Sequence, residues 1–380
     1  MSQERHCTLV SDSHVLSQQQ LPLVSICIPA YNAEATLGET LESLLSQDYP
    51  HLDIVVSDNH STDGTKAVVE SFTERGVRYC TPPKRPEWAS DLPSYVGAYI
   101  NSAYVLTQGR ADYLCLFHSD DLYDPSIVRR QVEMMQAYTH VGAVFTLLQT
   151  IGEDGRPINM GTSTLPKELR GRSRFDFSTL LNAVLTHSNF LATPSVMLRR
   201  STLEHVGSFD ERHFLTSADL EMWLRIAYQG YEIAVIDHPL LRYRISQRQF
   251  GTQYNKLRTT LADIFSVLDH YLSQPDVQMV VQPQLLALYR AQRASDSVLC
   301  AMHLLIQGKV VEARVLLQHA MHVRYFITAL KHPRLLARLI VGMCFWVSIR
   351  LGLGALLGQL VYHSYQRDLQ RRRQPLRQGK

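Results

Sequence analysis

The sequence predicts an α/β fold in which a doubly wound mixed sheet is followed by a helical C-terminal region. Two observations support this prediction. Short apolar runs alternate with segments of helical periodicity through residue 140, which is typical of parallel strands joined by crossover helices. Beyond residue 253 the apolar residues recur at helical spacing. The 380 residues, 45% hydrophobic and 19% charged, indicate a globular body of one large or two ordinary domains.

The first part of the chain carries the alternating pattern. The run Leu23–Pro29 is apolar and ends at a proline, as expected of a buried strand. Leu37, Leu41 and Leu44 follow at helical spacing. By the same reasoning we expect strands at Asp53–Ser57, Val77–Cys80 and Tyr113–Phe117, and helices at Ala33–Gln47, Lys66–Glu74, Ser94–Gln108 and from near Ser126.

From Val141 onward the pattern changes to longer strands and then to helices alone. We expect strands at Val141–Ile151, Ser195–Leu198 and Glu232–Ile245, and helices at Phe175–Leu185 and Ala218–Tyr228. A helix pair, Leu285–Ile306 and Val310–His322, follows around a turn at Gly308. One such pair cannot bury its own apolar face, so we expect it to pack against the rest of the protein.

Two adjacent carboxylates, Asp120 and Asp121, come directly after the expected strand Tyr113–Phe117. In an open α/β sheet, ligands bind beyond the carboxyl ends of the strands. Hard oxygen ligands suit Mg²⁺ or Mn²⁺, which can bridge the oxygens of a nucleotide diphosphate. The alternative is that the pair only caps the helix that begins near Ser126, because carboxylates favour helix starts.

The C-terminal segment is apolar and basic. Leu335–Tyr362 is largely apolar, but its uninterrupted run Leu339–Val347 is far shorter than the roughly 20 residues that a membrane span needs. Arg350 would lie near the middle of such a span. From Arg324 onward there are eleven Lys and Arg residues and one acidic residue, including Arg371–Arg373. We therefore expect an interfacial helix or a shallow hairpin at an anionic membrane; the alternative is an ordinary hydrophobic helix docked on the protein.

The cysteines and the N-terminus indicate a reducing compartment. The six cysteines are scattered, without a CxxC or a metal-binding spacing, at positions 7, 27, 80, 115, 300 and 344. Residues 1–20 are polar and rich in Gln and Ser, without the apolar core of a secretory signal. We expect residues 1–20 to be a disordered lead-in.

Four segments together resemble the family-2 glycosyltransferases of the GT-A fold. They are Val24–Asn32, similar to an opening strand that ends in Pro-x-Tyr-Asn; Ser57–Thr65, similar to an Asp-Asp-Gly-Ser-Thr-Asp-Gly-Thr turn; His118–Asp121, in the place of an Asp-x-Asp-Asp metal motif; and Ser217–Arg225, similar to a Glu-Asp…Trp-Leu-Arg helix. Each segment alone is a weak signal, but their order and spacing are specific. The resemblance covers about residues 21–246.

The resemblance implies a nucleotide-binding half, an acceptor half and a set of functional residues. Those implied for the donor nucleotide are Pro29, Tyr31, Asn32, Asp58, Asn101 and Ser119; those for Mn²⁺ or Mg²⁺ are Asp120, Asp121 and His118; and Asp219 is the implied catalytic base. For Asn101 an ordinary surface asparagine is an equal alternative. For Asp219 the alternative is a simple helix cap. A helix start favours a charged carboxylate, so we expect a lowered pKa for Asp219.

The sequence also departs from the family pattern. Asn59, His118 and Ala218 replace acidic residues of the turn, the metal motif and the base helix, and Ser246 stands where many members carry a histidine. Imidazole can bind Mn²⁺, whereas Mg²⁺ prefers oxygen. Arg244 or Arg248 are candidates to replace the missing histidine at the diphosphate.

These residues predict an inverting glycosyltransferase that moves a sugar from a nucleotide-diphospho-sugar to a hydroxyl of a glycan or lipid-linked acceptor in bacterial surface polysaccharide synthesis. An alternative, motivated by His118 and Ala218, is a catalytically inactive sugar-nucleotide-binding or scaffold protein. A sugar nucleotidyltransferase would need a Gly-rich loop with a basic residue after the first strand, and Tyr31–Glu34 has neither. Nucleic-acid binding is not expected, because no aromatic residues beyond Tyr365 interleave the arginine cluster.

We expect four regions along the chain. A disordered lead-in, residues 1–20, precedes the GT-A domain at 21–252. A helical accessory region at 253–332 and an apolar, basic, membrane-associated tail at 333–380 follow. The expected location is cytoplasmic, peripheral at the inner face of the cell membrane.

Overall fold

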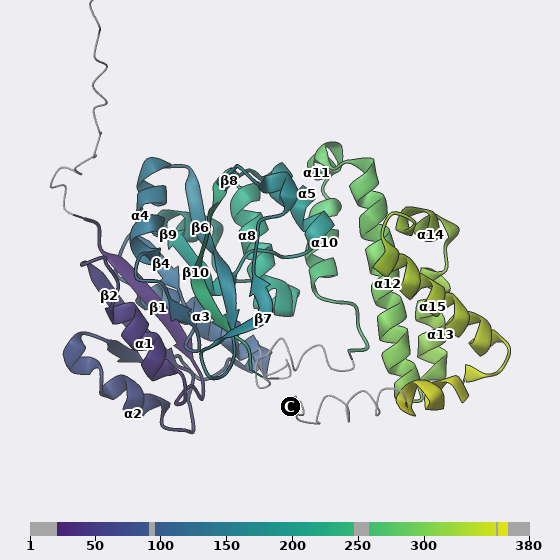
Figure 1. Cartoon of the computed structure of the whole chain (residues 1–380), viewed down its shortest axis with the longest axis horizontal. Coiled ribbons are helices and arrows are strands. Elements are labelled where there is room, and N and C mark those ends of the chain that lie inside the picture. Colours follow the sequence, from purple (N-terminus) through teal and green to yellow (C-terminus); the bar gives the residue numbers. More distant parts are fainter. Residues whose placement is uncertain (1–20, 91–95, 247–257, 355, 364–380) are drawn as a thin grey trace, which may run out of the picture.

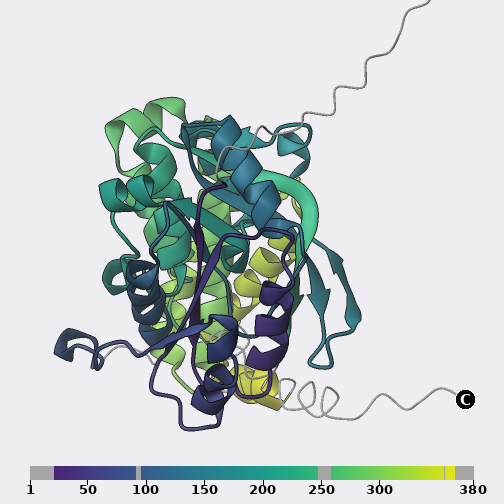
Figure 2. The same ribbon diagram turned by 90° about the vertical axis from the view of Figure 1, so that its left-hand side faces the viewer.

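The computed structural model describes residues 21–90, 96–246, 258–354 and 356–363. A twisted sheet with helices on both faces occupies one end of the molecule, and the C-terminal helices gather at the other (Figures 1 and 2). The predictions for residues 1–20, for Arg248 and for residues 364–380, Arg371–Arg373 included, lie outside the described residues.

Over these ranges ten strands form one mixed sheet in the order β3-β2-β1-β4-β9-β6-β10-β5, with β7 beside β6 and β8 beside β10. The strands β1 to β4 run parallel, and β9 lies antiparallel between β4 and β6. This mixed α/β sheet confirms the predicted fold class. The strands are β1 Val24–Ala30, β2 Leu52–Asp58, β3 Arg78–Cys80, β4 Tyr113–Leu116, β5 Leu122–Tyr123, β6 Val141–Ile151, β7 Pro157–Thr162, β8 Arg174–Phe175, β9 Val196–Arg199 and β10 Glu232–Arg244.

Two apolar cores lie on opposite faces of the sheet, because successive side chains of a strand alternate between faces. Ile26 and Ile28 of β1 belong to the core that includes Leu41. Cys27, between them, belongs to the core that includes Trp223. Strands that are covered on both faces need apolar residues at every position, which explains the continuous apolar runs in the sequence.

The helices agree with the predicted segments to within a few residues at most ends. They are α1 Leu37–Leu45, α2 Thr65–Glu70, α3 Val96–Gln108, α4 Ile127–Ala137, α5 Phe177–His187, α6 Arg200–Val206, α7 Glu211–Phe214, α8 Ala218–Tyr228, α10 Ile264–Leu272, α11 Pro275–Val280, α12 Pro283–Ile306, α13 Val310–Ala320, α14 Val323–Ala329 and α15 Pro333–Arg350. The sequence did not predict the short strands β5, β7 and β8 or the short helices α6 and α7, because two to seven residues carry little periodicity. Beyond residue 253 it predicted helical structure throughout, without separate bounds for α10, α11 and α14.

The C-terminal helices have a core of their own. Helices α12 to α15 enclose a small apolar cluster that includes Leu304, Leu317 and Leu339. Helix α12 also contacts α5, and so packs against the sheet domain as predicted. Among the described helices, none combines the length and the apolar character needed to cross a membrane.

Candidate active site

The sequence motifs meet at one edge of the sheet. The register pairs Ala30 with Asp58 at the ends of β1 and β2, and Cys27 with Leu116 near the end of β4. Because these strands are parallel, the segments that follow them leave the sheet at the same edge, where open α/β folds bind ligands. The fold therefore brings together the Pro-x-Tyr-Asn, Asp58 and His118–Asp121 motifs.

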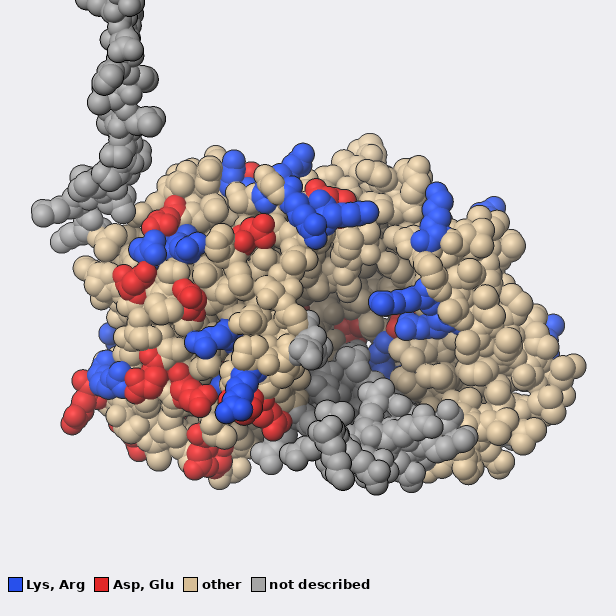
Figure 3. Space-filling model, in the orientation of Figure 1, with Lys and Arg blue, Asp and Glu red and all other residues tan. Residues whose placement is uncertain are grey.

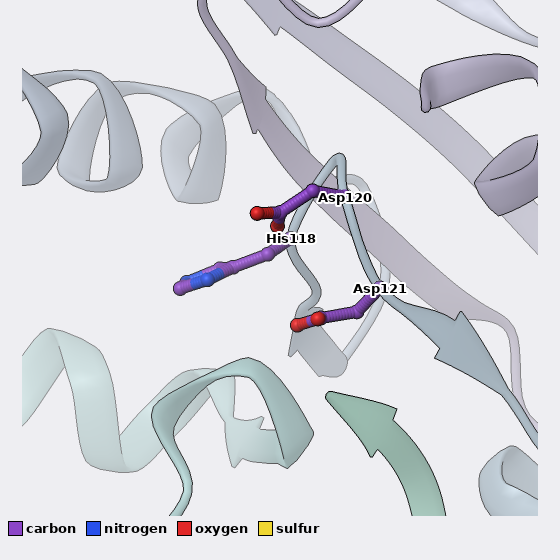
Figure 4. A group of neighbouring side chains, drawn as sticks. All are labelled: His118, Asp120 and Asp121. Carbon is purple, nitrogen blue, oxygen red and sulfur yellow. The ribbon is translucent and has the colours of Figure 1, made fainter. Parts of the chain in front are cut away.

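His118, Asp120 and Asp121 form a group that can hold a metal ion. Their ligand atoms lie within 4.8 Å of one another, and their side chains project from the loop after β4 in a similar direction (Figure 4). The N-cap of α4 is Ser126, no side chain makes a capping hydrogen bond there, and the carboxylate of Asp121 accepts the backbone N–H of Arg244 instead. The interpretation of Asp120 and Asp121 as mere caps of this helix is therefore wrong.

The carboxylate of Asp121 is buried, and only one of its two oxygens has a hydrogen-bond partner among the described residues. Its Oδ1 accepts the backbone N–H of Arg244 at 2.8 Å, whereas its Oδ2 has no partner among the described residues. Burial, together with the negative charge of Asp120, raises the pKa of Asp121 well above its usual value. A divalent cation would supply the missing partner and offset this cost, so the residues present fit Mn²⁺ or Mg²⁺.

Burial also holds His118 in the neutral form. It lowers the pKa of the imidazole, and the charges of Asp120 and Asp219 oppose this shift. The neutral imidazole is the form that binds metals. The backbone is fixed by Tyr123, whose hydroxyl accepts the N–H of His118 at 2.7 Å and whose ring stacks on Phe117 at 4.1 Å.

Residues outside the motifs hold the metal-candidate loop. The hydroxyls of Thr36 and Thr40 donate to the carbonyl of Ser119 at 3.0 and 3.1 Å, and Thr40 also donates to the carbonyl of Asp121 at 2.8 Å. Neither threonine was predicted from the sequence to belong to the site. Their four-residue spacing puts them on one face of α1, the only sequence signal that they act together.

Arg244 supports the same loop and is not available to a diphosphate. Its buried guanidinium donates to the carbonyls of Asp120 and Glu153, both at 2.8 Å, and to the carboxylate of Glu39 at 2.7 Å. The prediction that Arg244 replaces the missing histidine is therefore wrong. The guanidinium of this arginine is already engaged by the carboxylate of Glu39 and by the two backbone carbonyls.

Asp219 lies in the first turn of α8, and its environment differs from the one expected. Its Oδ2 accepts the hydroxyl of Thr193 at 2.7 Å, and its Oδ1 accepts the N–H of Leu220 at 2.7 Å. The N-cap position belongs to Ser217, so Asp219 is not the simple N-cap of the alternative interpretation. Burial raises the pKa of Asp219, although these hydrogen bonds and the nearby His118 oppose the shift. The expectation of a lowered pKa was wrong, because desolvation outweighs the helix terminus.

The residues expected at the donor nucleotide divide into two groups. Tyr31 is 61% exposed at the sheet edge, and Pro29 is half-buried beside it. Asp58 is buried, and its carboxylate accepts the hydroxyl of Tyr79 and the N–H of Ser61, both at 3.0 Å. Tyr79 was not predicted from the sequence to contact Asp58, because the two residues lie on different strands.

Asn32 and Asn101 hold the binding edge together. Asn32 adopts a positive φ of 47°, and its side-chain oxygen accepts the N–H of Thr62 at 2.9 Å. Asn101 is buried on α3; its Oδ1 accepts the hydroxyl of Ser57 at 2.6 Å and its Nδ2 donates to the carbonyls of Ser57 at 2.9 Å and Ala30 at 3.4 Å. The alternative of a surface asparagine at Asn101 is wrong. Its amide ties α3 to the ends of β1 and β2.

Comparison with known proteins identifies the domain. Residues 25–207 match the model of the glycosyl transferase family 2. TuaG of Bacillus subtilis (strain 168), whose name refers to teichuronic acid biosynthesis, is 24% identical over 224 residues, which are 59% of this chain and 79% of that protein. The amylovoran biosynthesis glycosyltransferase AmsB of Erwinia amylovora is 23% identical over 236 residues, 60% of this chain and 72% of AmsB.

Among solved structures, that of S. aureus TarS resembles this fold with a TM-score of 0.54 at 17% identity. The match covers 86% of this chain and 55% of the TarS chain. The family model, the relatives and the fold agree with the resemblance seen in the motifs. The chain therefore carries a family-2 glycosyltransferase domain of the GT-A fold.

Proposed function

We propose that the protein is an inverting glycosyltransferase that uses a nucleotide-diphospho-sugar and a divalent cation. One observation carries the proposal: Asp219, half-buried at the start of α8, and His118 of the candidate metal group each shift the pKa of the other, so the two side chains lie close together. A base and a metal group in one site are the two parts that such a reaction needs.

Asp219 acts as the general base. Burial raises its pKa, which makes the carboxylate a better proton acceptor than a free one. The hydrogen bonds from Thr193 and Leu220 fix its orientation. It takes the proton of the acceptor hydroxyl as that oxygen attacks the anomeric carbon from the face opposite the nucleotide diphosphate. The bond to the nucleotide breaks, and the configuration at the anomeric carbon inverts.

Asp120, Asp121 and His118 would hold Mn²⁺ or Mg²⁺. When bound, the cation would neutralise charge on the departing nucleotide diphosphate. Because one of the three ligands is an imidazole, Mn²⁺ should support turnover better than Mg²⁺.

The ends of β1 and β2 would bind the donor nucleotide. Asp58, Tyr31 and Pro29 are the proposed contacts at the base and ribose, with Ser119 beside the metal group. Asn32 and Asn101, already engaged in hydrogen bonds within the protein, would shape the pocket. The acceptor would be a hydroxyl of a glycan or lipid-linked saccharide in bacterial surface polysaccharide synthesis, a proposal that the names of TuaG and AmsB support.

The test is Asp219→Asn. Asparagine keeps the size and a hydrogen-bonding oxygen but is not a base, so we expect unchanged folding and donor binding, with sugar transfer reduced by a factor on the order of 10² or more. Nucleotide release from a panel of UDP-, GDP- and dTDP-sugars measures transfer and also identifies the donor. A variant that transfers sugar at nearly the wild-type rate would refute the assignment of the base. Wild-type protein that binds a donor without turnover on any acceptor would favour the inactive scaffold.

We also propose that the tail, residues 333–380, places the enzyme at the inner face of the membrane as a cytoplasmic, peripheral protein. Nine of the twenty-two exposed large apolar side chains within the described ranges lie in this tail, between Ile340 and Tyr362. Helix α15 buries Leu339 against the neighbouring helices and exposes Ile340, Val347 and the following Leu351 on its outer side. In Figure 3 the end of the molecule formed by the C-terminal helices is mostly uncharged, with scattered basic side chains. A surface of this kind can enter a bilayer interface.

The charge of this region favours an anionic surface. Helices α14 and α15 carry exposed Arg324, Arg334, Arg338 and Arg350, and no acidic residue lies between Val323 and Arg350. Each basic residue near an anionic membrane contributes about 1 kcal/mol. Beside Arg338, a groove of about 340 Å³ between α12 and α15 is otherwise lined by apolar side chains.

Cosedimentation with vesicles tests the membrane proposal. We expect the double variant Ile340→Asp and Val347→Asp to lose binding to vesicles that contain phosphatidylglycerol. Met279→Asp, which alters an apolar side chain 81% exposed on α11, is the control and should bind as wild type. High salt should release only part of the wild-type protein, because apolar burial persists when charge is screened. Wild-type protein that stays in solution would instead favour a docked helix without membrane contact.

A further inference from the structure

The turn that leads into α8 has a strained backbone. It is the short 3₁₀ helix Leu215–Ser217, which ends where α8 begins. Leu215 has a φ of 46°, a left-handed conformation that is unfavourable for a residue with a branched side chain. Such a conformation persists only where the surroundings hold it. Because Asp219 follows this turn by two residues, whatever holds the turn also sets the position of Asp219.

Thr216, in the middle of the turn, is bound at three points. Its N–H and its hydroxyl both donate to Oδ2 of Asp263, at 3.1 and 2.5 Å. Its carbonyl accepts the hydroxyl of Tyr99, on α3, at 2.9 Å. Asp263 lies 47 residues further along the chain, at the start of α10. The residue that holds the turn therefore comes from the helical region and not from the glycosyltransferase motifs.

Asp263 is itself anchored to α12 through the segment Arg258–Asp263, here called the strap. Arg258 makes a two-point ion pair with Asp296 of α12, at 2.9 and 2.7 Å, and both side chains are largely buried. Asp296 also accepts the N–H of Ala262 at 3.0 Å. His303, about two turns further along α12 than Asp296, contacts the carbonyl of Arg258 at 2.7 Å. Buried two-point contacts of this kind fix geometry more firmly than surface pairs do.

Helix α10 completes the connection between the two parts of the molecule. It lies between α8 and α12 in Figure 1, and it contacts α8 directly. Tyr289 of α12 donates its hydroxyl to Asp269 of α10 at 2.5 Å. A continuous set of contacts therefore runs from α12, through the strap and Asp263, to the turn before the base.

We propose that Asp263 is a positioning residue for sugar transfer, through which the helical region completes the active site of the glycosyltransferase domain. The proposal rests on Asp219 as the proposed base. Asp263 holds the turn so that the carboxylate of Asp219 meets the acceptor hydroxyl, and it takes no part in donor binding. A displacement of about 1 Å at a catalytic group can reduce the rate by about a hundredfold. The domain boundary predicted at residue 252 then separates two parts of the chain that form one functional unit.

A double-mutant cycle in the full-length protein tests this role. We expect Asp263→Ala to lower kcat by about tenfold or more and to leave the KM for the donor unchanged. On an Asp219→Asn background the same change should have little further effect, because the group that it positions is gone. Thr216→Val, which removes only the hydroxyl, should lower kcat less in the same way.

Asp276→Ala is the matched control. Asp276 on α11 accepts the hydroxyl of Tyr228 at 3.0 Å, so it ties the helical region to the other end of α8. We expect this variant to change thermal stability without lowering kcat. The proposal is overturned if Asp263→Ala keeps kcat within twofold of wild type, or if it lowers kcat equally in the wild type and in Asp219→Asn. If Asp219→Asn itself transfers sugar normally, the proposed base fails first, which is a different result.

Discussion

The hydrogen bond between Thr193 and Asp219 gives a sharp prediction for the pH dependence of transfer. The hydroxyl of Thr193 donates to Oδ2 of Asp219 at 2.7 Å and stabilises the carboxylate relative to the acid. Thr193→Val removes this donor and keeps the branched shape. The ionised carboxylate loses a partner, so the pKa of Asp219, already raised by burial, should rise further.

The size of the shift follows from the energy of such a bond. A hydrogen bond to a charged group contributes about 1.5–3 kcal/mol, and one pKa unit corresponds to about 1.4 kcal/mol. Asp219 is half-buried, so water replaces part of the lost interaction. We therefore expect a rise of about one pKa unit. A base must be ionised to act, so activity is lost as the pH falls through this pKa, and the acidic limb of the profile should move to higher pH.

Initial rates of nucleotide release, measured across the acidic limb with saturating donor, provide the assay. Above the limb, Thr193→Val should regain most of the wild-type rate. Thr202→Val is the control: Thr202 is buried, its hydroxyl has no partner within the described residues, and it lies outside the site. The control profile should match the wild type. An unmoved limb in Thr193→Val, or an equal shift in both variants, would refute the role of this hydrogen bond.

Two further predictions concern the metal group and the binding edge. Burial raises the pKa of Asp121 in the folded protein above its value in the unfolded chain, so ionisation of this carboxyl lowers the stability of the fold as the pH rises from the unfolded pKa through the folded one. Asp121→Asn should therefore raise the melting temperature of the metal-free protein at neutral pH and weaken Mn²⁺ binding. A wild-type Mn²⁺ affinity of this variant, measured by calorimetry, would contradict the site. Asn101→Ala leaves polar groups of Ser57 unpaired and should lower the free energy of unfolding in urea by about 2–4 kcal/mol. Asn182→Ala is the control and should lower it less, because Oδ1 of Asn182 already has no partner in the described structure. Equal losses in the two variants would contradict the role assigned to the Asn101 hydrogen bonds.

The sequence by itself determined the order of the main strands and helices and the edge at which the motifs meet. Continuous apolar runs such as Val24–Ala30 and Val141–Ile151 indicate strands that are buried on both faces. Apolar residues at helical spacing indicate a helix with one buried face, so both kinds of element can be recognised from the local sequence. His118, Asp120 and Asp121 follow a strand directly, and local order alone predicted that they lie together.

The tertiary structure decided the state of those residues. The pKa of Asp219 depends on burial, which raises it, and on hydrogen bonds from the distant residues Thr193 and Tyr99, which lower it, and no local pattern reports that these residues approach. Arg244 looked available for a phosphate until the fold brought Glu39 to it from 205 residues away. Asp263 likewise became part of the site only through packing. Periodicity and motif spacing are local properties of the chain, whereas desolvation and hydrogen-bond partners depend on which distant segments meet.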